Sequence, residues 1–310
     1  MRGKTDIRAD GGRKKILLIS YHFPPNSAVG GARAANFAKR LPDYGFDTLV
    51  LTVKDRYIER IDTERLKGVE KIRVIKAGKL PRVTQLVLAL RPWKKRSASA
   101  KQAPAPATAT PPSPGSESIK DRLKRYIKSF LMLPDLERNW ILPVFLKGLK
   151  AIRSEKIDCI ISSCPPYSAH LAALLLKAAT GVRWVADFRD PWMITGSKRL
   201  YQTCALSLMI DRWMERTVIR NADMAMFNTL KMRDEYEKRY GRGGKKFLYV
   251  PNGFSPEEFS FLKGVAKYDR FTLTHAGSMY MGRTPEPVFM AVKRLIDDGK
   301  VRPEEINIKL

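Results

Sequence analysis

Short runs of aliphatic and β-branched residues alternate along the chain with longer stretches in which apolar residues recur at helical spacing. This alternation predicts a parallel sheet covered by helices. The predicted strands lie at 16–20, 47–53, 72–76, 157–162, 183–187, 224–228 and 247–250, and the predicted helices between them include 32–41, 169–179, 201–220 and 230–240. The fold class expected is therefore α/β with a doubly wound sheet, whose ligands bind at the carboxyl ends of the strands.

The pattern restarts after Pro251-Asn252-Gly253, which is a turn signal. Three further elements are predicted there: a strand at 271–275, a helix at 285–298 and a strand at 306–310. A single strand, helix and strand is too small to bury a core of its own. We therefore expect residues 1–253 to form a first Rossmann-like domain and residues 254–310 the start of an incomplete second one. Either the chain is a fragment or a partner completes this part.

An insertion interrupts the first domain. Residues 94–118 are rich in Pro, Ala and Ser and predict a disordered segment. In residues 119–133 the apolar positions recur at helical spacing, with basic residues on the other flank. Residues 91–150 carry 13 basic and 4 acidic residues, a net charge of +9. Two interpretations stay open for the apolar stripe of 119–133: a face packed on the core, or a helix lying on an anionic membrane surface.

The charge of the whole chain narrows the possible partners. The sequence has 58 Lys and Arg against 31 Asp and Glu, a formal net charge of +27. Such an excess attracts nucleic acid, phosphorylated ligands or anionic membranes. Finger spacing, an RNP-like aromatic box and a heptad zipper are all missing from the sequence, so we expect no nucleic-acid partner.

Chain length and cysteine content limit the classes of protein to which this sequence can belong. The 310 residues are 44% hydrophobic, which is enough for a buried core. No apolar run reaches the roughly 20 residues of a spanning helix, and no apolar segment of signal-peptide length follows the basic start. Cys159, Cys164 and Cys204 show neither a disulfide nor a zinc spacing. We therefore expect a cytoplasmic protein.

The loop after the first strand holds Gly30 and Gly31 at the start of a helix. Backbone N–H groups and the helix dipole at such a start bind phosphate or carboxylate. The spacing is not the dinucleotide fingerprint GxGxxG. The alternative is that the two glycines only permit the turn.

A second candidate loop follows the strand at 183–187. Asp187, Arg189 and Asp190 precede Pro191, which delays the next helix. Arginine makes bidentate contacts to phosphate, and carboxylates accept hydrogen bonds from sugar hydroxyls. The alternative is a buried ion pair between Arg189 and an Asp that fixes the loop.

The three histidines are weaker candidates. His22 follows the first strand and is expected to be structural, so we do not assign it as a general base. His170 lies near a helix start, where we expect a helix-start or packing role. His275 ends the strand of the second domain, on the side where a ligand of that domain would bind.

Four segments in order resemble the family 4 glycosyltransferases of GT-B fold. They are Tyr21-His22-Phe23-Pro24-Pro25 with Gly30-Gly31, Ala186-Asp187-Phe188-Arg189-Asp190-Pro191-Trp192, Val250-Pro251-Asn252-Gly253-Phe254, and His275-Ala276-Gly277-Ser278 through Gly282-Arg283. The resemblance covers nearly the whole chain except the N-terminal tail and the insertion.

The resemblance implies a nucleotide-sugar donor, a glycan or lipid-linked acceptor, and retention of anomeric configuration. It implies that Gly277, Ser278 and Arg283 bind the donor diphosphate, while Gly30 and Gly31 remain binding candidates from their place at the helix start. Members with a His in the mid-domain loop place it near the transferred sugar. This chain has Arg189 and Asp190 there, and these two are its catalytic candidates.

The resemblance also implies that no metal or other cofactor is obligatory, and the sequence shows no Asp-x-Asp pair after a strand. We therefore expect a glycosyltransferase at the cytoplasmic face of the membrane, inactive as this chain alone. Two alternatives stay open: a non-catalytic module that binds membranes or polyanions, and a nucleotide-sugar epimerase on the same fold.

Overall fold

The first part of the chain is built on one parallel sheet. The structure, a computed structural model, describes residues 12–81, 118, 126–127, 129–193, 204–241, 246–254, 256–262, 264–277, 279 and 284–310. Seven strands of these ranges pair in the order β3-β2-β1-β4-β5-β6-β7, all parallel. They are β1 (Lys14–Ser20), β2 (Phe46–Val53), β3 (Arg73–Ala77), β4 (Cys159–Cys164), β5 (Arg183–Phe188), β6 (Met224–Phe227) and β7 (Lys246–Tyr249). The predicted doubly wound sheet is confirmed.

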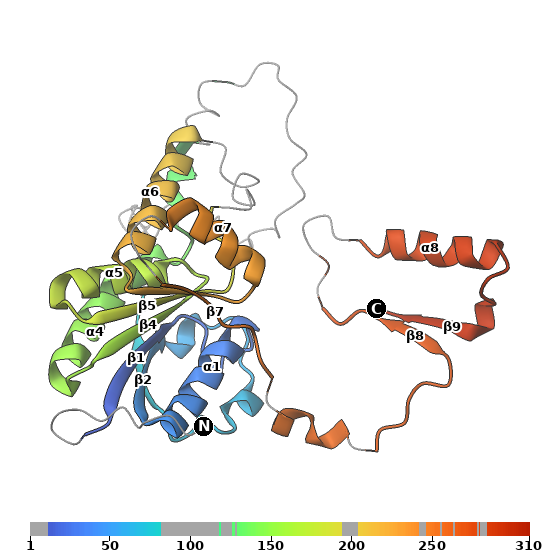
Figure 1. Cartoon of the computed structure of the whole chain (residues 1–310), viewed down its shortest axis with the longest axis horizontal. Coiled ribbons are helices and arrows are strands. Elements are labelled where there is room, and N and C mark those ends of the chain that lie inside the picture. Colours follow the sequence, from blue (N-terminus) through green and yellow to red (C-terminus); the bar gives the residue numbers. More distant parts are fainter. Residues whose placement is uncertain are drawn as a thin grey trace, which may run out of the picture. The chain divides into compact units, whose positions relative to one another are not determined.

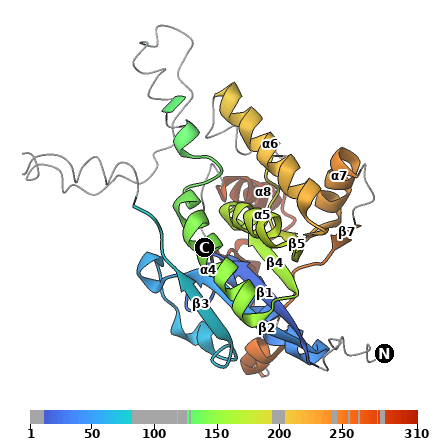
Figure 2. The same cartoon turned by 90° about the vertical axis from the view of Figure 1, so that its left-hand side faces the viewer.

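Helices cover both faces of this sheet (Figures 1 and 2). They are α1 (Gly30–Arg40), α4 (Ile141–Glu155), α5 (Ser168–Thr180), α6 (Ala205–Asn221) and α7 (Leu230–Tyr240). Successive side chains of a strand point to opposite faces. Leu17 and Ile19 of β1 therefore pack in the cluster that holds residues of α4, α5, α6 and α7. Ile16 and Leu18 pack in the other cluster, with alanines of α1.

Helix α4 is an element that the sequence pattern did not predict. It contains Pro143 near its start and Gly148 inside it, both of which weaken a helical signal. Gly148 lies so close to α5 that an added Cβ would stand 2.7 Å from Leu176 Cδ1. The glycine is therefore explained by close helix packing. The strand after α4 was predicted from residue 157, but β4 begins at Cys159 because Lys156 ends the helix with φ 54° and the Ile157 N–H still bonds to Ile152 O.

A second compact unit includes Phe254–Leu310. Its strands β8 (Phe271–Thr274) and β9 (Ile306–Lys309) pair in parallel, with Phe271 opposite Ile306. Helix α8 (Glu286–Asp297) lies between them in sequence and has no buried residue. A second parallel sheet of this size fits an incomplete Rossmann-like domain.

The predicted insertion at 94–118 and the first part of the predicted helix at 119–133 lie outside the described residues, apart from Ser118. Helix is present at 126–127 and 129–131. None of the helices in the described ranges is long and apolar enough to cross a bilayer.

Candidate functional site

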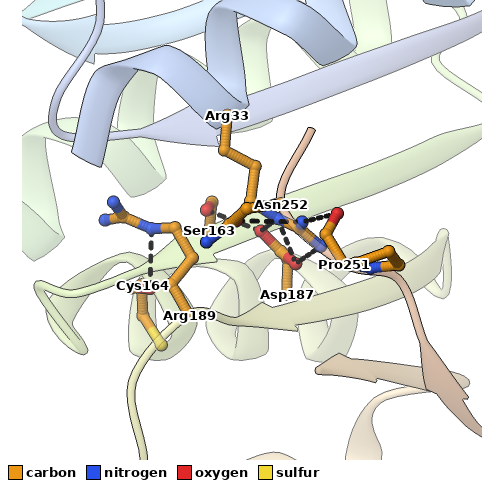
Figure 3. A network of polar contacts seen from close by, with 7 residues as sticks. All are labelled: Arg33, Ser163, Cys164, Asp187, Arg189, Pro251 and Asn252. Carbon is orange, nitrogen blue, oxygen red and sulfur yellow. Dashed lines mark hydrogen bonds and ion pairs between the residues drawn. The ribbon is translucent and has the colours of Figure 1, made fainter. Parts of the chain in front are cut away.

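The candidate site lies where the chain changes direction across the sheet. After β1 the chain adds β2 and β3 on one side, and it later adds β4 to β7 on the other. The carboxyl ends of β1, β4 and β5 are level, because Ser20 pairs with Ser163 and Cys164 pairs with Phe188. Ligands of doubly wound sheets bind at such a switch point. The loops after β1 and β5 and the start of α1 meet there (Figure 3).

A buried ion pair joins α1 to the end of β5. The guanidinium of Arg33 donates from Nε to both oxygens of Asp187 at 3.1 Å and from Nη2 to Oδ1 at 2.9 Å. Arg33 is 8% exposed and Asp187 is fully buried. Ser163 Oγ donates to Asp187 Oδ2 at 2.8 Å from the neighbouring strand. The carboxylate is thus fully engaged and holds structure, so it is not available to a ligand.

The same arginine binds the segment by which the chain leaves the first unit. Nη1 of Arg33 donates to Pro251 O at 2.9 Å and to Asn252 Oδ1 at 3.3 Å (Figure 3). Arg33 therefore ties together a helix start, a strand end and the residues just before Gly253. Sequence reasoning missed this residue as a site component. The sequence feature that could have identified Arg33 is its position three residues after Gly30, on the first turn of the helix.

Arg189 turns away from Asp187 toward the start of α1 (Figure 3). Its Nε donates to Cys164 O at 2.9 Å and its Nη2 donates to Pro165 O at 2.5 Å. A Cβ built on Gly30 would overlap Nη1 of Arg189 and lie 2.9 Å from Nη2. The alternative of a buried Arg189–Asp ion pair is thus wrong for Asp187, since Arg33 takes that carboxylate. The structure brings together two predicted site residues, Gly30 and Arg189.

The two glycines have different roles. In the described part of the chain nothing accepts the Gly30 N–H, whereas the Gly31 N–H donates to Ala28 O at 2.9 Å. Gly31 is buried, and an added Cβ would lie 3.4 Å from the backbone carbonyl of His22. The expectation that both glycines offer N–H groups is therefore wrong for Gly31. Neither glycine has a positive φ.

A positive group thus lies against the positive end of a helix. The N-terminus of α1 has no side-chain cap and no acidic residue in its first turn. The Arg189 guanidinium contacts it at Gly30, and within the described ranges no carboxylate pairs with Arg189. Two like charges repel unless an anion lies between them or beside them. This arrangement favours binding of a phosphate or another anionic group.

Asp190, the other catalytic candidate, is exposed next to Arg189. No hydrogen bond to its carboxylate occurs among the residues that the structure describes. Asp187 and Asp190, three residues apart, therefore lie in opposite environments. Asp187 stabilises the fold, and Asp190 is accessible to a ligand.

Helices α6 and α7 hold the loop that carries Arg189 and Asp190. The Trp192 indole donates to Asp211 Oδ1 at 2.7 Å, and Met193 N–H donates to Glu215 Oε1 at 3.0 Å. Tyr236 and Tyr240 of α7 also donate to Glu215. Asp211 and Glu215 are fully buried. Sequence reasoning missed both, although two acids four residues apart on the apolar face of a helix are a signal of buried hydrogen bonds.

His22 is held as a neutral ring with a defined tautomer. The Ala28 N–H donates to Asn26 Oδ1 at 2.9 Å, so the Asn26 amide nitrogen is the group that faces His22 Nδ1 at 3.2 Å. Because that amide donates, Nδ1 accepts and the ring proton is on Nε2. Burial, with the charges of Arg189 and Lys79, lowers the pKa of His22 to about 4. This agrees with the structural role that the sequence predicted.

Ser162 and His170 form a pair that resembles a nucleophile and its base. Ser162 Oγ lies 2.7 Å from His170 Nδ1, but both residues are fully buried and Trp184 Nε1 donates to the same oxygen at 2.8 Å. Burial, and to a smaller extent the positive charge of Arg189, lowers the pKa of His170 to about 3. No substrate reaches this pair, so His170 has the packing role predicted for it.

In the second unit, Gly277 follows β8 with φ 155°, a backbone conformation that favours glycine. His275 is exposed at the end of the same strand. Ser278 and Arg283 lie outside the described residues. No cluster of three or more His, Cys, Asp or Glu suited to a metal ion occurs in the ranges that the structure describes.

A sequence model of the family described as glycosyl transferase 4-like domain matches residues 30–253. A search of curated protein sequences found no significant match. Among solved structures, the Anabaena protein HepE in complex with UDP and glucose matches with a TM-score of 0.51 and 14% identity, over 95% of this chain and 60% of that one. Sucrose-phosphate synthase from Thermosynechococcus elongatus matches with a TM-score of 0.50 and 12% identity, over 96% of this chain and 70% of that one.

A UDP-N-acetylglucosamine 2-epimerase also matches, with a TM-score of 0.45 and 10% identity over 96% of this chain and 63% of that one. A likeness this weak does not support the epimerase alternative. The chain spans about 60% of the length of the HepE structure. At these identities the solved structures show a shared GT-B fold.

Proposed function

Because the chain belongs to the glycosyl transferase 4-like family, we propose that it is part of an enzyme that transfers a sugar from a nucleotide-sugar donor to a lipid-linked or surface-polysaccharide acceptor. HepE is described with UDP and UDP-glucose, which supports a nucleotide sugar as the donor class. The anomeric carbon of the sugar loses its bond to the donor diphosphate and gains one to the oxygen of an acceptor hydroxyl, and the proton of that hydroxyl passes to the leaving diphosphate.

The observation that carries this proposal is the contact of Arg189 with the start of α1 at Gly30. When the glycosidic bond to the diphosphate breaks, negative charge grows on the leaving phosphate. A fixed guanidinium and a free helix N–H stabilise such charge, because they need no reorganisation as it develops. Two backbone carbonyls and the α1 contact hold the guanidinium in place before the donor binds.

We assign Asp190 to the acceptor side of the reaction. Its carboxylate is exposed beside Arg189, on a loop that α6 and α7 hold through Trp192 and Met193. A carboxylate in this position accepts a hydrogen bond from an acceptor hydroxyl and orients it. Retention of anomeric configuration is proposed from membership of the family.

We propose from the family motif that the second unit also binds the donor. Gly277 follows β8 in a conformation suited to close backbone approach, and Ser278 and Arg283 come after it in the family motif. Replacing Arg283 by Ala is expected to weaken donor binding more than acceptor binding. An unchanged donor affinity in this variant would show that Arg283 does not bind the donor.

We propose that the enzyme acts at the cytoplasmic face of a membrane, where a lipid-linked acceptor is presented. The support is the net charge of +27, which favours association with anionic lipid headgroups. We propose a peripheral location, with nucleotide sugar supplied from the cytoplasm and a lipid-linked glycan presented by the membrane.

A transfer assay tests the function. The full-length protein is incubated with radiolabelled UDP-, dTDP- and GDP-sugars and with membranes that carry lipid-linked glycans, and label is followed into the lipid-soluble fraction. We expect label from one nucleotide class, lost in the Arg189→Gln variant and kept in Arg183→Gln. Absence of both transfer and donor binding with every donor would contradict the proposal.

A further inference from the structure

Helix α6 buries both of its acidic residues beside Met214, Val218 and Ile219, and it exposes three other large apolar residues. Asp211 and Glu215 are fully buried against the loop at 192–193. Leu206, Met209 and Trp213 are instead 50%, 60% and 65% exposed. An amphipathic helix on a globular protein normally places these residue classes the other way round.

The exposed face of α6 is also basic. Arg212, Arg216 and Arg220 are exposed, and no described carboxylate forms an ion pair with any of them. At about 100° per residue, these three arginines and the three apolar side chains fall within about 120° of the helix circumference. Because both acids face inward, this arc carries only positive charge. We call these six residues the α6 surface.

A second apolar strip lies beside it. Figures 1 and 2 both place the short helical turns at 126–127 and 129–131 next to the N-terminal end of α6. Ile127, Phe130 and Leu131 in these turns are exposed. These three apolar side chains are thus exposed on a segment of the first unit whose backbone lies near the N-terminal end of α6. Large apolar residues exposed in one region of a protein mark sites of interaction.

We propose that the α6 surface docks onto an anionic lipid bilayer, with Trp213, Met209 and Leu206 in the headgroup region and the three arginines among lipid phosphates. Tryptophan favours the membrane interface, and arginine extends its charge to the headgroups while its apolar stem stays on the surface. Charge complementarity selects a lipid surface as the occupant, since the arc has positive charge and no acid. The proposal deepens the peripheral location given above and is independent of the transfer chemistry.

The tryptophans of this protein allow a test specific to this surface. Of the five in the sequence, Trp140, Trp184 and Trp192 are fully buried and Trp213 is exposed. The fifth, Trp93, lies outside the described residues and is replaced by Phe in the test protein. Lipid that quenches tryptophan emission on contact then reports on Trp213.

The full-length Trp93→Phe protein is mixed with vesicles of phosphatidylcholine alone or with phosphatidylglycerol, with and without brominated acyl chains. We expect the emission to shift to shorter wavelength and to be quenched by the brominated anionic vesicles only. The triple variant Arg212→Gln/Arg216→Gln/Arg220→Gln should bind these vesicles roughly 100-fold more weakly. The matched control Lys231→Gln/Lys238→Gln/Arg239→Gln removes three exposed charges from α7 and should bind nearly as well as the parent.

If the protein sediments with anionic vesicles but Trp213 is not quenched, the proposal that the α6 surface binds lipid is wrong. The proposed location at a membrane would not be contradicted by that result. Absence of any vesicle binding would overturn both. Equal losses in the α6 and α7 triple variants would show that only total charge matters, which also contradicts the proposal. Donor affinity, measured without vesicles, reports separately on the transfer function.

Discussion

Arg33 and Asp187 form a buried ion pair in which the guanidinium reaches both carboxylate oxygens, with the shortest contact at 2.9 Å. The pair connects two elements that are 154 residues apart in sequence. Through Pro251 O, the same arginine also holds the end of the first unit. The geometry of the site therefore depends on a pair that itself touches no ligand in our proposal.

Replacing Asp187 by Asn should destabilise the protein strongly. The change leaves the Arg33 charge buried without a counter-charge, and breaking a buried pair in this way costs about 3–5 kcal/mol in the free energy of unfolding. Denaturant titration of the full-length protein measures it. The control is Asp190→Asn, an exposed carboxylate on the same loop, which should change stability by less than about 0.5 kcal/mol. Similar losses of stability in both variants would show that the buried Arg33–Asp187 pair contributes no more to stability than the exposed carboxylate of Asp190 does.

The two glycines at the start of α1 should respond differently to substitution. A methyl group at position 30 would overlap the Arg189 guanidinium and displace it from the start of α1 without meeting the backbone, so Gly30→Ala should fold normally and bind donor more weakly. A valine at position 31 meets the backbone of His22, which does not move freely, so Gly31→Val should cost about 1–3 kcal/mol of stability.

Thermal unfolding and donor titration on both variants separate these effects. Full donor affinity in Gly30→Ala would show that the position of Arg189 does not matter for binding. A fully stable Gly31→Val would show that the contact with His22 relaxes without cost.

Stability should fall as the pH is lowered below about 6.5. Burial, the main cause, lowers the pKa of His22 to about 4 and that of His170 to about 3. In the unfolded chain both titrate near 6.5, so the unfolded state binds protons first as the pH falls. Their stabilisation is complete above pH 6.5 and is lost as the pH falls toward the folded values.

Each such histidine contributes a slope of about 1.4 kcal/mol per pH unit between pH 5 and 6. His170→Asn should therefore flatten the dependence of unfolding free energy on pH by about that amount, whatever its effect at pH 7. The exposed His275→Asn serves as the control. An unchanged slope in His170→Asn would mean that this ring is protonated in the folded state.

Much of the sheet could be predicted from the sequence because apolar runs in a parallel sheet are nearly continuous. The strands β1, β2 and β5 differ from their predicted limits by no more than two residues at either end. Helix α4 was not predicted, because Gly148 and Pro143 weaken a pattern that tertiary packing then restores.

The site was predicted less completely. Gly30, Arg189 and Asp190 follow strands that end at the same edge of the sheet, as expected for a parallel sheet, and their roles in binding and catalysis stay predictions. The partner of Asp187 could not be found, because Arg33 is distant in sequence and charged residues near a helix start are usually solvated. The pairing of Asp211 with Trp192 depends in the same way on how α6 crosses the loop.

In the proposed mechanism, Arg189 at the start of α1 binds the donor phosphate. Isothermal titration of the full-length protein with its nucleotide-sugar donor measures this contact when the parent is compared with Arg189→Gln and Arg183→Gln. Arg183 is the first residue of β5 and Arg189 directly follows its last residue, so each variant loses one charge at one end of this strand. We expect Arg189→Gln to weaken donor binding about 10- to 100-fold, the equivalent of roughly 1.5–3 kcal/mol for a charge-assisted contact, and Arg183→Gln to bind as the parent does. Equal donor affinity in the parent and the Arg189→Gln variant would contradict the account.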